Sequence, residues 1–168
     1  MAIGTSIRVP PASPPSLGRM SARSRNLPRR SCLSIPGSSD KMLAKGPGIP
    51  ADMVFLDLED AVAPKEKEAS RSKIATAIRT QEWGDKVLCV RVNDWSTKWT
   101  AFDIIEVVGN AGPRLDEIML PKVESAAQVV ATDMLLRQVE IAAGLPIGHI
   151  GIEVQIETAR GLINVEEI

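Results

Sequence analysis

The 168-residue sequence holds few of the side chains from which disulfide scaffolds and zinc sites are built. It contains two cysteines and one histidine. Cys32 and Cys89 each lie within an apolar run, without CxxC spacing or a neighbouring histidine, which argues against a disulfide framework and against a zinc site. We interpret both cysteines as core residues of a protein from a reducing compartment. His149 has no partner at a telling spacing, so we interpret it as an ordinary polar residue at a strand edge.

Long hydrophobic runs and an excess of one charge are also missing. No apolar run approaches the roughly 20 residues that a membrane helix needs. The formal net charge is −1, with basic and acidic residues balanced along most of the chain, which gives no reason to propose a nucleic acid or an anionic membrane as partner. With 44% apolar and 24% charged residues, the composition is that of one globular core. We therefore expect a soluble protein that acts on a small molecule.

Acidic residues are absent from the first 29 positions, which contain five arginines and many serines and prolines. Prolines at positions 10, 11, 14 and 15 would interrupt the amphipathic helix of a mitochondrial presequence. We therefore predict a disordered leader over 1–29, a folded domain over 30–168 and a cytoplasmic location. If the leader is nevertheless a presequence, the location is the mitochondrial matrix.

From Arg30 onward, short apolar runs alternate with longer helical patterns. Pro64 is well placed in a first helical turn, Ser125 is a candidate helix cap, and glycines mark the ends of three of the helical patterns. The predicted strands are 32–36, 51–60, 86–93, 116–124 and 149–158, and the predicted helices are 39–45, 64–80, 101–112 and 125–144, with another beginning at Arg160.

This alternation predicts an α/β fold with a parallel sheet covered by helices. Two architectures fit it, an open doubly wound sheet and a piece of a (β/α)₈ barrel. The first strand-to-helix turn, "IPGSSDK", lacks both GxGxxG and the P-loop pattern, so it does not indicate nucleotide binding. Charged and amide side chains follow each of the next four predicted strands, as expected where a barrel collects its chemistry.

The candidate site begins at "MVFLDLEDAVAP", where a buried-looking strand runs into Asp57, Glu59 and Asp60. Carboxylates that meet at about 5 Å repel each other by roughly 3 kcal/mol per pair at an effective dielectric of about 20, so positive charge is expected nearby. Arg91 supplies part of it. An all-oxygen cluster also suits Mg²⁺, for which the alternating polar face of "GIEVQIE" offers Glu157.

Each of these residues also has a plainer interpretation. Asp60 could cap the following helix, Arg91 could be a structural ion-pair partner, and Glu157 could lie on a solvated edge strand. Lys122 could be a loop lysine or a phosphate contact, or it could be the nucleophile of a Schiff-base aldolase.

Five ordered motifs carry a resemblance to a known family. The segments "PRRSCLSIPGSSDKMLAK", "FLDLEDAVAPKEKEASR", "CVRVN", "IMLPKVES" and "IETARGLIN" occur in the order and approximate spacing of the citrate lyase beta subunit-like CoA ester lyases, within the HpcH/HpaI aldolase superfamily. The match spans about residues 29 to 168. The resemblance implies a (β/α)₈ barrel that uses Mg²⁺ to cleave or form a carbon–carbon bond in an acyl-CoA such as malyl-CoA, citramalyl-CoA or citryl-CoA.

The family's functional residues map onto matching positions. Glu157 would be the metal ligand and would also contact the substrate, and Glu59 and Asp60 would hold metal-bound waters. Arg91 would bind the substrate and stabilise developing charge. Arg30, with Lys41 as a weaker candidate, would contact the nucleotide end of CoA. The resemblance also implies a homo-oligomer, a trimer or hexamer, in the full-length form.

The resemblance covers only the first five of eight βα units. The family's second metal ligand, an aspartate after the sixth strand, and its C-terminal lid have no counterpart in the sequence. We therefore expect either the N-terminal part of a longer enzyme or a truncated, non-catalytic product. Residues 1–168 alone are expected to be inactive and prone to association through open strand edges.

Overall fold

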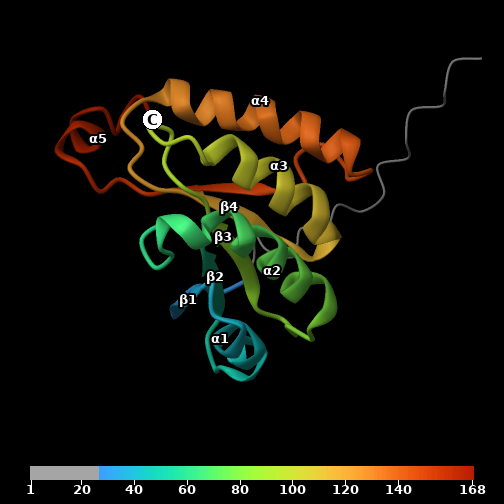
Figure 1. Cartoon of the computed structure of the whole chain (residues 1–168). Helices are drawn as coiled ribbons and strands as arrows, with labels where there is room; N and C mark the ends of the chain where they lie inside the picture. The colour runs from blue at the N-terminus through green and yellow to red at the C-terminus, as the bar shows by residue number, and fades with distance from the viewer. Residues whose placement is uncertain (1–26) are drawn as a thin grey trace, which may run out of the picture.

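The structure, a computed structural model, describes residues 27–168 as one sheet with helices (Figure 1). The strands are β1 (Cys32–Pro36), β2 (Met53–Asp57), β3 (Val87–Arg91), β4 (Glu117–Leu120) and β5 (Gly151–Val154). The helices are α1 (Asp40–Lys45), α2 (Lys67–Thr80), α3 (Thr100–Ala111), α4 (Ala126–Ala142) and α5 (Ala159–Ile163). Short 3₁₀ turns are η2 (Gly46–Gly48), η3 (Pro64–Glu66) and η4 (Gly112–Arg114).

The order of the strands separates the two architectures left open by the sequence. All neighbouring pairs are parallel, and the sheet runs β1-β2-β3-β4-β5 in chain order. A doubly wound sheet reverses its direction of growth at a switch point, whereas a (β/α)₈ barrel adds each strand beside the previous one. The described strands therefore follow barrel order, which confirms the predicted fold class.

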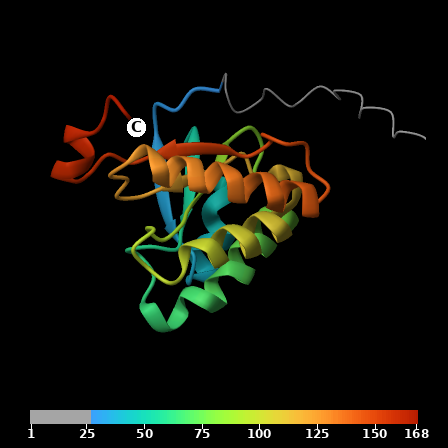
Figure 2. The ribbon, with the colours of Figure 1, turned by 90° about the horizontal axis from the view of Figure 1, so that it is seen from above.

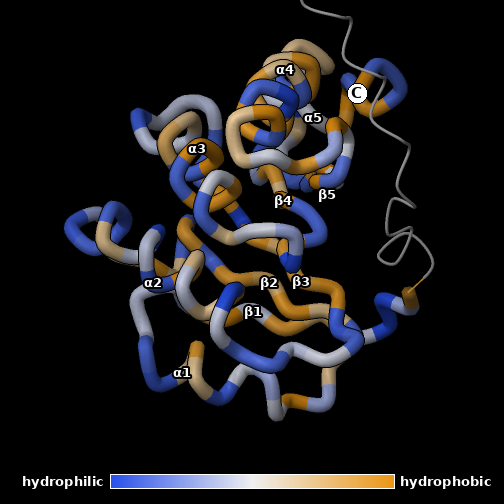
Figure 3. The backbone as a smooth tube through the Cα atoms, turned by 90° about the vertical axis from the view of Figure 1, so that its right-hand side faces the viewer, coloured by the Kyte–Doolittle hydropathy of each residue, from blue (hydrophilic) through white to orange (hydrophobic). Residues whose placement is uncertain are grey.

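One face of the sheet is covered by helices. Figures 1 and 2 show α2, α3 and α4 side by side along it. Alternate strand residues such as Val54, Leu56, Leu88 and Val90 are fully buried in a core cluster with the inner sides of these helices. Figure 3 shows hydrophobic residues concentrated along the central strands β2 and β3. This packing is what the nearly continuous apolar strands predicted.

The other face carries the remaining strand residues and corresponds to the interior of a barrel. A smaller apolar cluster of Met53, Val87, Cys89 and Met119 lies there, with Leu27 packed against it. The two cysteines differ from expectation in one respect. Cys89 is buried, but Cys32 is exposed, because β1 is an edge strand whose first residues have a neighbour on one side only.

The helix boundaries follow local capping. Ser39 accepts a hydrogen bond from the Met42 amide at the start of α1, and Thr158 accepts one from Gly161 at the start of α5. Ser125 occupies the cap position of α4 as predicted, and Gln128 Oε1 accepts from its backbone amide at 3.1 Å. Pro64 opens η3 rather than α2 itself, so the α-helix begins three residues later than predicted. Within residues 27–168, no helix combines the length and apolarity needed to cross a membrane.

Candidate active site

Polar residues from four successive strand ends meet at the carboxyl edge of the sheet. Asp57 is the last residue of β2, and Glu59 follows it in the turn toward α2. Arg91 ends β3 directly opposite Asp57, and Lys122 follows β4. The parallel arrangement explains the convergence, because equivalent ends of parallel strands lie at the same edge. Asp60 and Glu157 lie beside these residues. We call the whole group the mouth cluster; it comprises Asp57, Glu59, Asp60, Arg91, Lys122 and Glu157.

A two-point ion pair between Arg91 and Asp57 anchors the cluster. Arg91 donates from Nη2 to Asp57 Oδ2 at 2.6 Å and from Nε to Oδ1 at 2.8 Å. Asp57 is completely buried, and it also accepts from the backbone amides of Glu59 at 2.9 Å and Ala61 at 3.1 Å. Burial alone would raise the pKa of Asp57, but the bonds from Arg91 and from the two amides outweigh it and lower the pKa. Arg91 is therefore a structural ion-pair partner, as its plainer interpretation proposed.

Glu59 is the member of the mouth cluster whose hydrogen-bonding capacity is incompletely used. Its side chain is only 4% exposed, and its Oε1 accepts from Lys122 Nζ at 2.6 Å. Its Oε2 lies 3.3 Å from Arg91 Nη1 but is buried without a hydrogen bond. Burial raises the pKa of Glu59, opposed by Lys122 and Arg91. A buried acceptor without a donor costs free energy, which a bound cation or water would recover.

Lys122 is held as an ammonium group. Its hydrogen bond to Glu59 raises the pKa of Lys122, and Asp60 Oδ1 lies 3.6 Å away. A Schiff-base nucleophile needs the opposite shift, because only the neutral amine attacks a carbonyl. The geometry therefore disfavours that alternative. Lys122 is also the one described non-glycine residue with positive φ, at 52°.

Asp60 and Glu157 lie on the exposed side of the cluster. The Asp60 side chain is 69% exposed, and α2 begins seven residues later with Glu66 at its cap position, so the helix-cap alternative for Asp60 is wrong. β5 ends at Val154, so Glu157 lies in the following segment rather than at the strand end, and it is exposed. Its Oε1 accepts from the Lys122 backbone amide at 2.8 Å, which ties it to the mouth.

The mouth offers oxygen ligands and an excess of negative charge. Its four carboxylates face two cations, and the Oε1 of Gln155, next to the mouth, is also buried without a hydrogen-bond partner. These donors suit Mg²⁺, which takes one or two carboxylates and retains waters. Within residues 27–168, however, no three His, Cys, Asp or Glu side chains gather closely enough to form a preassembled metal site. The carboxylate and amide oxygens present therefore suit a cation held by few protein ligands.

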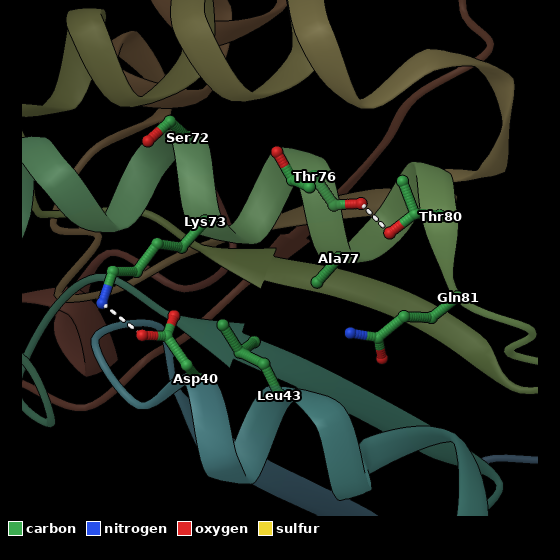
Figure 4. Close-up of a pocket in the computed structure, with 8 residues that line it drawn as sticks. All are labelled: Asp40, Leu43, Ser72, Lys73, Thr76, Ala77, Thr80 and Gln81. Atoms are coloured by element: carbon green, nitrogen blue, oxygen red, sulfur yellow. Dashed lines mark hydrogen bonds and ion pairs between the residues drawn. The ribbon is translucent and has the colours of Figure 1, made fainter.

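Two residues assigned to the nucleotide end of CoA lie away from this cluster. Arg30 precedes β1, at the amino edge of the sheet, where its 81% exposed side chain pairs with Asp52 at 2.9 Å. Lys41 is exposed on α1. Beside it, α1 and α2 enclose a surface hollow of about 340 Å³, crossed by the 3.0 Å ion pair between Lys73 and Asp40 (Figure 4). This hollow belongs to the outer helical layer, and the structure does not bring Arg30 or Lys41 to the mouth.

Sequence reasoning missed Lys67, which the structure buries beneath the mouth. Its side chain is 6% exposed, and Nζ donates to the carbonyl oxygens of Leu58 at 2.8 Å and Glu59 at 2.7 Å and to Asn93 Oδ1 at 2.7 Å. The charged run "PKEKE" gave no cue, since such runs ordinarily form solvated helix faces.

The amino edge of the sheet carries a second charged group. Arg29 donates to both carboxylate oxygens of Glu117, at 2.8 and 2.7 Å, and to Glu153 at 3.1 Å. Arg29 and Leu27 fall within the predicted leader, and both contact the sheet. The rest of the predicted leader lies outside the described residues.

Comparison with known proteins gives a consistent relationship. Residues 30–168 match the HpcH/HpaI aldolase/citrate lyase family. An L-malyl-CoA/beta-methylmalyl-CoA lyase of Cereibacter sphaeroides (strain ATCC 17025 / ATH 2.4.3) is 44% identical over 141 residues, covering 84% of this chain and 44% of that protein. A (3S)-malyl-CoA thioesterase of the same strain is 38% identical over 141 residues, covering 84% of this chain and 45% of the thioesterase. The chain thus spans less than half the length of these relatives.

Solved structures share the fold. The protein CitE from Mycobacterium tuberculosis in complex with magnesium and acetate superposes with a TM-score of 0.62 at 31% identity, covering 89% of this chain and 52% of CitE. The Haloferax volcanii malate synthase lead(II) complex gives a TM-score of 0.74 at 20% identity, over 82% of this chain and 43% of the synthase, which supports the fold alone. The matched family, the order of the strands and the shared motifs lead to one conclusion: this chain belongs to the HpcH/HpaI aldolase/citrate lyase family.

Proposed function

We propose that the protein is a Mg²⁺-dependent carbon–carbon lyase that cleaves a hydroxyacyl-CoA of the malyl-CoA, citramalyl-CoA or citryl-CoA type. The observation that carries the proposal is the mouth cluster, in which Arg91 and Lys122 flank a buried Glu59 whose Oε2 has no hydrogen bond. The malyl-CoA lyases and CitE among the relatives support the substrate class and the metal.

The chain's own residues supply binding and electrostatics for such a cleavage. Arg91 is fixed through Asp57, so its remaining guanidinium edge can stabilise negative charge that develops on an enolate or carboxylate oxygen. Lys122, kept protonated by Glu59, adds a second positive charge at the same edge. Glu157 would be the protein ligand of the metal, and Glu59 and Asp60 would orient its waters. When bound, Mg²⁺ acts as a Lewis acid and a template for the oxygens of the small acid.

The direct test substitutes Glu157 in the protein expressed at its natural length. Glu157→Gln removes a ligand charge at nearly constant volume, so Mg²⁺-dependent cleavage should be lost while the circular dichroism spectrum stays unchanged. Glu153→Gln is the matched control, since Glu153 points to the same face of the sheet near its amino edge and should keep full activity.

Two results would contradict the proposal. Turnover of Glu157→Gln at wild-type rate under low Mg²⁺ would remove Glu157 from the metal site. A borohydride-dependent mass increase on Lys122 in the presence of substrate, together with resistance to EDTA, would assign the protein to the Schiff-base class instead.

A further inference from the structure

Lys67 is a charged residue at a helix position and at a degree of burial that both disfavour a cation. It is the first residue of α2, where the helix dipole disfavours a cation, and its side chain is 6% exposed. Burial lowers the pKa of Lys67, and the carboxylates of Asp103, Asp57 and Glu59 oppose that effect. An apolar side chain of similar length would fill this space without the desolvation cost. The reason for a lysine must therefore lie in what its ammonium group binds.

All three N–H donors of Lys67 are used, and all three acceptors belong to the ends of β2 and β3. Two are consecutive carbonyl oxygens, Leu58 at 2.8 Å and Glu59 at 2.7 Å, and the third is Asn93 Oδ1 at 2.7 Å. Lys67 Nζ also lies 5.2 Å from the centre of the Trp99 ring. The ammonium group thus cross-links two neighbouring strand ends directly beneath the mouth.

This cross-link is itself anchored to the helical layer. Asn93 donates from its backbone amide at 3.0 Å and from Nδ2 at 2.7 Å to Asp103 Oδ2 on α3. Arg71, on α2, donates to Asp103 Oδ1 at 2.8 Å. Asn93 and Asp103 are 2% and 0% exposed, so the whole chain of bonds is shielded from water.

The turn that carries Glu59 and Asp60 is consequently held from both sides. Asp57 accepts from the amides of Glu59 and Ala61, while Lys67 donates to the carbonyls of Leu58 and Glu59. We propose that Lys67 is a positioning residue of the active site, which fixes the 58–61 turn against β3 so that the Glu59 and Asp60 carboxylates stay aimed at Arg91 and Lys122. The catalytic part of this inference rests on the proposed function, and the structural part does not.

The test compares Lys67→Met with Ile78→Ala in the natural-length protein. Ile78 is a buried core residue near the opposite end of the same helix, so its truncation destabilises α2 without touching the turn. Amide hydrogen exchange of residues 59–62 should accelerate at least about tenfold in Lys67→Met relative to Ile78→Ala, because the turn loses its carbonyl anchors. The kcat for lyase activity should fall by about 10–100-fold with KM changed far less, a magnitude typical of residues that orient a site from behind.

Lys67→Arg keeps the charge and provides a variant that folds if Lys67→Met does not. A planar guanidinium cannot direct three donors onto these three converging acceptors, so the same local acceleration of exchange is expected at smaller amplitude. Exchange at 59–62 equal to wild type in both Lys67 variants, or an equal kcat loss in Ile78→Ala, would overturn the inference. If the proposed function is wrong, activity is absent in the wild type as well, yet the exchange difference still decides the positioning role.

Discussion

Both edges of the sheet contain a two-point arginine–carboxylate pair, but among the described residues only the carboxyl edge also contains a buried carboxylate oxygen without a hydrogen bond. At the amino edge, Arg29 meets both carboxylate oxygens of Glu117 and also Glu153. At the carboxyl edge, Arg91 meets both oxygens of Asp57 but forms no hydrogen bond with Glu59 Oε2. A buried carboxylate is fully paired at one edge and left partly open at the other.

Unpaired hydrogen-bond acceptors indicate which of the two charged edges can bind a ligand. A two-point arginine–carboxylate pair completes the hydrogen bonding of its members and stabilises structure. Glu59 Oε2, by contrast, is buried beside Arg91 and Lys122 without a hydrogen bond. Its burial costs free energy that a bound ligand can recover by supplying a partner. Charge alone does not distinguish the two edges, but hydrogen-bond satisfaction does.

The largest effect is expected from breaking the arginine pair at the carboxyl edge. Arg91→Met leaves the fully buried Asp57 without its cation, which should lower the free energy of unfolding by about 3–5 kcal/mol. Arg30→Met is the control, because the Arg30 side chain is 81% exposed and its ion pair with Asp52 should contribute little to stability. Urea denaturation of both variants measures the contrast, and similar losses would refute it.

A smaller effect is expected from breaking the amino edge. Arg29→Met should cost about 1–2 kcal/mol at neutral pH, since Arg29 is one-third exposed while Glu117 is 6% exposed. Adding Glu117→Gln should recover most of this loss by removing the unpaired charge. The proposed lyase activity should be unchanged in both variants, so a loss of kcat in a folded Arg29→Met protein would show that the two edges are not independent.

The smallest effect is the opposite pH dependence of the two carboxylates that form two-point pairs with arginine, Asp57 and Glu117. The lowered pKa of Asp57 gives stability that is complete above the ordinary Asp value of about 3.9 and is lost as the pH falls through the folded value. Burial raises the pKa of Glu117 despite Arg29, so its contribution is complete below the ordinary Glu value of about 4.3 and is lost as the pH rises through the folded value.

Denaturation curves collected between about pH 3 and 6 can separate these two contributions. Asp57→Asn should flatten the acid side of the stability profile, and Glu117→Gln should gain stability relative to wild type as the pH rises. The same sign of change in both variants would contradict the opposite pKa shifts of Asp57 and Glu117.

Much of the site could be predicted because the strand ends are short, local patterns. Asp57, Glu59, Asp60 and Arg91 each directly follow or end an apolar run, and parallel pairing then brings them to one edge. What could not be predicted is which oxygen stays unpaired. Lys122 reaches Glu59 across 63 residues of sequence, and no periodicity specifies a contact at that separation.

Some errors have a common physical cause, namely burial created by packing between elements. The charged run "PKEKE" predicts a solvated helix residue at Lys67, and its neighbours in the run are indeed exposed. Lys67 itself is buried, and its ammonium group donates to Asn93, which follows β3. Cys32 is interpreted as a core residue because it begins the predicted strand that contains Leu33 and Ile35, yet β1 is an edge strand and Cys32 is exposed. Arg29 appears to belong to an acid-free leader, and its partner Glu117 lies 88 residues away.

Local sequence patterns were sufficient to predict the alternation of strands and helices, the cap at Ser125 and the apolar face of each strand, because these features depend on residues close together in the chain. The order of the strands in the sheet, the pairing of Arg91 with Asp57 and the burial of Lys67 became apparent only in the folded structure. Those features depend on contacts between distant segments, whose energies arise from desolvation and hydrogen bonding after the chain has packed.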